Sequence, residues 1–160
     1  MRSIRARRHS GFAVATLLSL GVAWAGPPAT VQSSAGPTPK EQTVTRIHLI
    51  AGAQTFTAVL DDTRAARDFA RLLPLDLTLS DYAGTEKVAD LPRRLSTEGA
   101  PAAYAAAAGD LTYYAPWGNL AVFYKPFRSA SGLVRLGHIQ GGHVASLEGR
   151  VRVERVAAPR

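Results

Sequence analysis

Apolar and polar side chains alternate in short segments along residues 44–156, as they do in strands that bury one face. In the first segment, Ile47 and Leu49 share one face, and Arg46 and His48 share the other. The same alternation predicts eight strands, at residues 44–50, 54–60, 75–80, 85–91, 110–115, 120–125, 133–139 and 150–156. Short strands with polar outer faces favour a mainly β fold, a closed antiparallel barrel, because closure leaves no exposed strand edge.

The spacing of apolar residues changes from two to that of a helix between the second and third strands. Ala65, Phe69, Leu72 and Leu73 fall on one face, with arginines on the other. This spacing predicts one α-helix over about 62–73. Its expected N-cap is Asp61 or Asp62, and Pro74 is expected to end it.

The N-terminus has the pattern of an export signal. Four arginines lie within the first eight residues, and an uncharged apolar run of 15 follows, at 11–25. The run ends in Ala23-Trp24-Ala25, which has small residues at the two positions that signal peptidase recognises. A membrane span needs about 20 apolar residues, so we expect cleavage rather than stable membrane insertion. Arg7-Arg8 leaves the choice between the general and the twin-arginine export route open.

The chain therefore divides into four parts. Residues 1–25 are the predicted secretory signal peptide, and residues 26–43, rich in Pro, Ser and Gly, are a predicted flexible spacer. Residues 44–156 form the predicted folded domain, and residues 157–160 are a tail. The mature protein is expected to be exported, either to the periplasm or out of the cell.

The charge of the chain changes once the signal is set aside. The formal net charge is +7, but four of the 19 Lys and Arg residues and none of the 12 Asp and Glu residues lie in the signal. The rest of the chain has 15 basic and 12 acidic residues, a difference of +3, so no nucleic-acid partner is predicted. The chain has no Cys, so its stability must come from a packed core without disulfides.

No residue set for catalysis, a metal or a cofactor stands out. The predicted domain has three histidines, His48, His138 and His143, and the third ligand that a zinc site on the last two would need is not evident. No Gly-x-Ser-x-Gly turn, phosphate-binding glycine loop or paired carboxylates at a telling spacing occur. We therefore predict no catalytic residues, no metal and no cofactor.

The candidate binding residues are concentrated in an aromatic hairpin, residues 109–127. Tyr113 and Tyr114 lie on opposite faces of its first strand, Trp117 lies in the turn, and Tyr124 ends the second strand. A strand covered on both sides, or lining a groove on one, would have this pattern. Rings with hydroxyl tips suit a shallow peptide-binding groove, and they also suit a core, so both interpretations stay open.

A long loop region, residues 84–104, supplies charged candidates. Glu86, Arg93 and Arg94 are expected at the rim of the groove, where a guanidinium could hold a carboxylate or a carbonyl oxygen. Long ordered loops often carry binding residues. The alternative is a solvated surface.

Three stretches resemble the bacterial cyclophilin-like domain family: "TEKVADLPRRL", "STEGAPAAY" and "GDLTYYAPWGNLAVFYK". The resemblance covers about residues 44–156 and implies a closed eight-stranded antiparallel barrel with a helix capping one end. It does not extend to the isomerase site of true cyclophilins, because the Phe-His-Arg motif that carries their catalytic Arg is missing. Gln140-Gly141-Gly142 is present, but His143 replaces the Asp of the isomerase segment, and it follows the aromatic hairpin rather than preceding it.

The sequence thus predicts a binding module for a peptide or small molecule, without catalysis. The alternative is a divergent peptidyl-prolyl cis/trans isomerase that uses Arg93 or Arg94. The identity of the ligand and the oligomeric state stay open.

Overall fold

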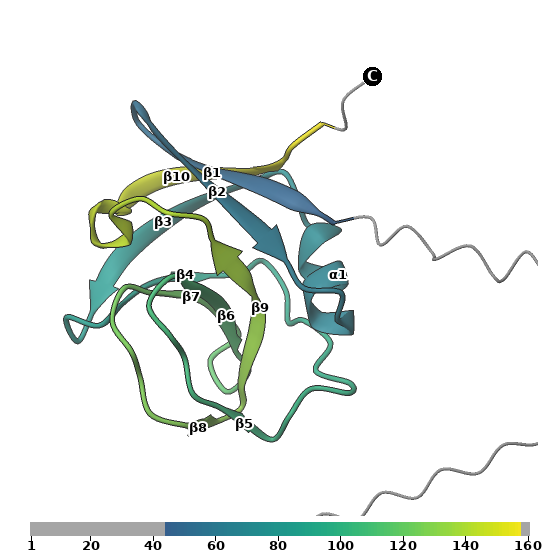
Figure 1. Cartoon of the computed structure of the whole chain (residues 1–160). Helices are drawn as coiled ribbons and strands as arrows, with labels where there is room; N and C mark the ends of the chain where they lie inside the picture. Colours follow the sequence, from purple (N-terminus) through teal and green to yellow (C-terminus); the bar gives the residue numbers. More distant parts are fainter. Residues whose placement is uncertain (1–43, 158–160) are drawn as a thin grey trace, which may run out of the picture. The chain divides into compact units, whose positions relative to one another are not determined.

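The computed structural model describes residues 44–157, and the predicted signal, the spacer and the last three residues lie outside this range. Eight strands of this part form a closed barrel in the order β1-β10-β3-β4-β7-β6-β9-β2, and every neighbouring pair is antiparallel (Figure 1). The strands are β1 (Arg46–Ala51), β2 (Gln54–Leu60), β3 (Leu75–Tyr82), β4 (Glu86–Asp90), β6 (Asp110–Tyr114), β7 (Asn119–Phe123), β9 (Leu133–Ile139) and β10 (Gly149–Arg155). The predicted mainly β barrel is confirmed.

Alternation along the strands fills the barrel. Ile47 and Leu49 of β1 are fully buried, as the pattern predicts, while Arg46 on the other face is exposed. Each of the remaining barrel strands also contributes at least one inward side chain to the same buried cluster. An eight-stranded barrel is just wide enough for side chains to fill it, so this cluster is a solid core.

The helix α1 (Arg64–Ala70) is shorter than the predicted span and begins at a different residue. Its N-cap is Thr63, whose hydroxyl accepts a hydrogen bond from the Ala66 N–H at 3.2 Å. The expected N-cap, Asp61 or Asp62, was therefore wrong. Both carboxylates instead pair with arginines, Asp61 with Arg135 and Asp62 with Arg67. The fully buried Phe69 joins the barrel core, so α1 closes one end of the barrel.

Two long connections cover the outside of β6 and β7. They carry the short strands β5 (Ala103–Tyr104) and β8 (Ala130–Ser131), which pair with each other below the barrel in Figure 1. Beneath them lies a second buried cluster, formed by Ala106, Ala121, Phe123 and Leu133. This cover explains why both faces of the aromatic hairpin are apolar: one faces the barrel core and the other faces this cluster. The remaining element is a single 3₁₀ turn, Val144–Ser146.

Lys87 is an exception to the apolar interior. It lies in the charged region 84–104, but its side chain is only 5% exposed. Its Nζ lies 3.1 Å from Asp81 Oδ1 and 3.0 Å from Glu148 Oε2, so the ammonium joins β4 to the end of β3 and to the residue before β10. Burial lowers the pKa of Lys87, but its bonds to the two carboxylates raise it by more.

Among residues 44–157, no helix is both long and apolar enough to cross a membrane.

Candidate ligand-binding groove

A cavity of about 320 Å³ lies on the outer face of the barrel, beside the cover formed by the long connections. Its floor is β7, whose outward positions alternate with inward ones that fill the core. Ala121 in the middle of this floor is small, which leaves room between the larger side chains of Asn119 and Phe123. The pleat of a single strand therefore produces both the core and the groove.

Neighbouring strands add the walls through their register. Glu86 of β4 is paired with Phe123, and Tyr114 of β6 is paired with Asn119. Both side chains line the cavity. Residues directly opposite on paired strands have neighbouring side chains, so the sheet fixes these four groups next to one another.

Trp117, in the turn between β6 and β7, forms the outer wall with two tyrosines. The rings of Tyr82 and Tyr114 lie 5.5 Å and 5.4 Å from its ring, with interplanar angles of 86° and 81°. Trp117 is 57% exposed and Tyr82 is 44% exposed, and they are two of the three large hydrophobic side chains exposed within residues 44–157. Exposed aromatic rings gathered at a cavity are typical of a binding surface.

The turn that presents Trp117 is held from outside the groove. The Gly118 N–H donates to the Tyr114 carbonyl at 2.8 Å, and Gly118 has a φ of +77°, which favours glycine. The guanidinium of Arg94 donates to the carbonyls of Ala115 at 2.6 Å and Pro116 at 3.3 Å. Arg94 thus positions the turn rather than lining the groove.

Few polar side chains line the groove, and the acceptor oxygens of Glu86 and Asn119 have no partner among residues 44–157. Burial raises the pKa of Glu86, and no described neighbour offsets it. The Oδ1 atom of Asn119 is buried and accepts no hydrogen bond from any residue that the structure describes. Arg128 is the cation of the groove, and its guanidinium carbon lies 5.8 Å from the centre of the Phe127 ring.

Comparison with known proteins identifies the fold that carries this groove. The sequence profile of the cyclophilin-like family matches residues 49–155. The chain belongs to the cyclophilin-like family. A hypothetical protein from Archaeoglobus fulgidus, whose structure was determined in solution, is similar with a TM-score of 0.57 at 18% identity, over 74% of this chain and 100% of that one. This likeness shows the fold alone, and no curated protein matches the sequence.

In this cyclophilin-like domain, the groove brings together three of the seven predicted binding residues: Glu86, Tyr114 and Trp117. Tyr113 is 1% exposed and belongs to the barrel core, where its hydroxyl accepts a hydrogen bond from the Leu95 N–H at 3.2 Å. Its alternative interpretation as a core residue is the one that the structure supports.

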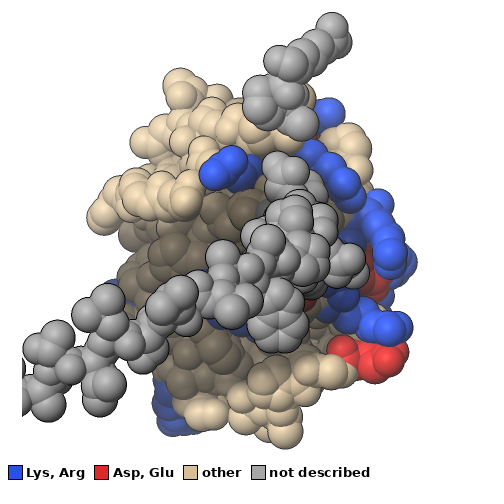
Figure 2. Space-filling view, turned by 45° about the vertical axis from the view of Figure 1, so that its right-hand side comes forward, with Lys and Arg blue, Asp and Glu red and all other residues tan. Residues whose placement is uncertain are grey.

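Arg93 and Arg94 do not line the groove. The guanidinium of Arg93 donates to both carboxylate oxygens of Asp68 on α1, at 2.8 Å and 3.0 Å. Basic side chains are frequent on the face shown in Figure 2, along one edge and next to acidic ones. Arg64 and Arg93 form ion pairs with Glu98 and Asp68, so the charge of these two arginines is locally neutralised.

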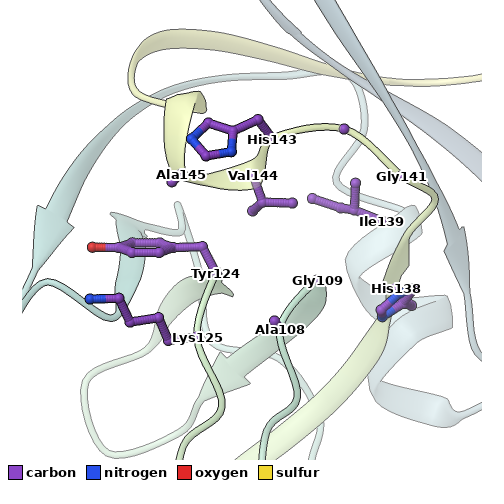
Figure 3. A pocket seen from close by; sticks show the side chains of 11 residues that line it. Ala108, Gly109, Tyr124, Lys125, His138, Ile139, Gly141, His143, Val144 and Ala145 are labelled. Carbon is purple, nitrogen blue, oxygen red and sulfur yellow. The ribbon is translucent and has the colours of Figure 1, made fainter.

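Tyr124 lies at a second cavity, of about 470 Å³, together with His138, His143 and Lys125 (Figure 3). Its hydroxyl donates to Asp81 Oδ1 at 2.7 Å. The two histidine rings lie on opposite sides of this cavity in Figure 3. Within residues 44–157, no group of three or more His, Cys, Asp or Glu side chains could hold a metal ion.

Sequence reasoning missed several residues of the groove: Tyr82, Asn119, Phe123, Phe127 and Arg128. The alternation across the hairpin places Phe123 on the outer face, and a register for the hairpin would have placed Asn119 beside Tyr114. Tyr82 reaches the groove from the end of β3 and Phe127 from the connection that follows β7, and no local pattern marks them.

Proposed function

We propose that this domain is a binding module that takes a peptide segment or a small molecule into the groove of β7, without catalysing a reaction. The observation that carries the proposal is the exposed aromatic wall: Trp117 and Tyr82 are partly exposed at the edge of a cavity whose acceptors on Glu86 and Asn119 have no partner within the described residues. A volume of about 320 Å³ is at the lower end of ligand-sized cavities. The pattern of residues 1–25 is the basis for placing this binding outside the cytoplasm.

Trp117, the central residue of this aromatic wall, has the chemistry of an anchor residue in a binding site. A tryptophan gives a large, rigid contact surface at a small cost in conformational entropy. Removing such an anchor typically costs 2 kcal/mol or more of binding free energy, or about 30-fold in affinity. The 57% exposure of Trp117 means that its removal should affect folding little.

The test uses the full chain and a mixture of short peptides and small molecules of varied charge, screened by chemical-shift changes in nuclear magnetic resonance spectra. Hits should perturb the signals of Trp117, Tyr114 and Phe123. The Trp117→Ala variant should lose at least about tenfold in affinity at an unchanged melting temperature. His143→Ala, in the second cavity, is the matched control and should bind as the parent does. A screen in which no compound perturbs these signals refutes the proposal.

The second candidate, prolyl isomerisation, is favoured by one observation: Arg128 lies in the groove beside aromatic rings. The arginines considered from sequence, Arg93 and Arg94, are bound to Asp68 and to turn carbonyls. An isomerisation assay on a proline-containing peptide decides this point. Activity in the parent that disappears in Arg128→Ala would establish catalysis and overturn the non-catalytic proposal.

A further inference from the structure

The groove offers two hydrogen-bond acceptors that nothing in the described structure uses. Glu86 is a half-buried carboxylate without an ion-pair partner in residues 44–157, and Asn119 Oδ1 is a buried amide oxygen without a donor. A buried acceptor without a donor costs free energy in the folded protein. A ligand that donates hydrogen bonds and carries positive charge would remove this cost at both Glu86 and Asn119.

The aromatic wall has the matching electrostatics. The face of an aromatic ring is negative, and a cation within about 6 Å of the ring centre is attracted to it, most strongly for tryptophan. Tyr82 and Tyr114 stand nearly perpendicular to Trp117, so the three rings form a corner with faces turned in different directions. Corners of this kind beside a carboxylate suit an ammonium group better than a neutral or anionic one.

The opposing charge in the groove is Arg128. Its guanidinium carbon lies 5.8 Å from the Phe127 ring, and no ion pair links it to Glu86. The positive charge of Arg128 therefore has an aromatic partner of its own and leaves the carboxylate free. It should still repel a second cation weakly.

From these observations we infer that the ligand of the groove presents an alkylammonium group, such as a lysine side chain or a free primary or methylated amine, to Glu86 and the corner of Trp117, Tyr82 and Tyr114. This inference rests on the proposed function and names the ligand class of the same site. The apolar part of the ligand would lie over Ala121 and Phe123, and the ammonium would neutralise the desolvated carboxylate.

The test compares probes of nearly equal shape in calorimetric titrations of the full chain. The cations are n-butylammonium and the amide of Nα-acetyl-lysine. The neutral counterparts are n-butanol and the amide of Nα-acetyl-norleucine, and butyrate is the anion. Each cation should bind at least about tenfold more tightly than its neutral counterpart. Tighter binding of the lysine probe than of butylammonium indicates a peptide ligand, and the reverse order indicates a free amine.

Four variants examine the role of each charged or polar group. Glu86→Gln should lose about tenfold in cation affinity and keep the affinity for the neutral probes, whereas Glu98→Gln, an exposed glutamate outside the groove, should change neither. Arg128→Ala should raise cation affinity. Asn119→Leu should weaken cation binding without lowering the melting temperature, because it removes a buried acceptor that has no donor within residues 44–157.

The outcomes separate this inference from the proposed function. Equal affinity for cations and neutral probes, preference for butyrate, or unchanged cation binding in Glu86→Gln refutes the cationic ligand and leaves the groove as a binding site. Failure of every probe, together with failure of the mixed screen, refutes both. A cation preference lost in Glu86→Gln and kept in Glu98→Gln supports the inference.

Discussion

The buried carboxylate of Asp110 should be the most important polar group for stability in the barrel. Its side chain is 3% exposed and accepts four hydrogen bonds: from the Tyr104 hydroxyl at 2.7 Å, the Ala107 N–H at 2.8 Å, Arg135 Nε at 3.2 Å and His138 Nδ1 at 3.1 Å. Burial raises the pKa of this carboxyl group, but the hydrogen bonds lower it by more, so the net pKa is below the ordinary value. The folded state therefore holds this carboxylate in its charged form.

The loss in the free energy of unfolding caused by Asp110→Ala depends on which hydrogen-bond donors lose their only acceptor. Arg135 keeps both oxygens of Asp61, at 2.7 Å and 2.8 Å, and the His138 side chain is 44% exposed and can bind water. The main losses are therefore at Tyr104 and the Ala107 N–H, at about 1.5 kcal/mol or more each for hydrogen bonds to a charged group. We expect a loss of about 3 kcal/mol in the free energy of unfolding, which lowers the melting temperature by roughly 10 to 20 °C.

Urea unfolding of the full chain, followed by circular dichroism, measures this loss. Asp110→Asn keeps the shape and one acceptor and should lose only about 1 to 2 kcal/mol. The control is Asp76→Ala, which removes a carboxylate that is 66% exposed and pairs with Arg152 at the surface, and it should stay within about 0.5 kcal/mol of the parent. A loss below about 1 kcal/mol in Asp110→Ala, at an unchanged dependence on urea, would show that the hydrogen bonds to Asp110 from Tyr104 and the Ala107 N–H contribute little to stability.

Two further predictions concern other ion pairs. Lys87→Met should change the free energy of unfolding by less than about 1 kcal/mol, because both carboxylate partners are exposed enough to be hydrated. Lys87→Ala should cost about 2 kcal/mol, because it leaves a cavity. Urea unfolding compares the two variants, and a large loss in Lys87→Met would contradict this reasoning. The hydrogen bond from Arg93, and then that from the Ser96 N–H, lower the pKa of Asp68 from 3.8 to about 2. A lowered carboxyl pKa adds stability above pH 3.8, and this stability is lost as the pH falls toward 2. The difference in melting temperature between the parent and Asp68→Asn should therefore shrink as the pH falls from 3.8 to 2. A difference that stays constant over this interval would refute the prediction.

Much of the fold was predictable because it depends on local patterns. Alternation of apolar residues marks strands and their buried faces whatever their neighbours are, and it placed Ile47 and Leu49 of β1 in the core. The N-cap was predicted wrongly because Asp and Thr are both good caps. In the structure both carboxylates form ion pairs: Asp61 with Arg135, which lies 74 residues away in sequence, and Asp62 with Arg67.

The groove was predictable only in part, because it depends on contacts between segments far apart in the sequence. The hairpin marked Tyr114 and Trp117, and the charged loop marked Glu86, but the sequence could not separate them from Tyr113, which the pleat turns into the core. Side chains one residue apart on a strand have opposite surroundings, and the loops that cover one face determine which of them meets solvent.

The sequence alone therefore determined the barrel and the positions that fill it, because both follow from short-range periodicity. The tertiary structure decided which aromatic residues form a wall, that the half-buried Glu86 has no ion-pair partner within residues 44–157, and that Lys87 is buried. These properties depend on contacts between segments far apart in the chain, as with Lys87 and Glu148, which are 61 residues apart. No local pattern encodes such contacts, since they exist only once the barrel has closed.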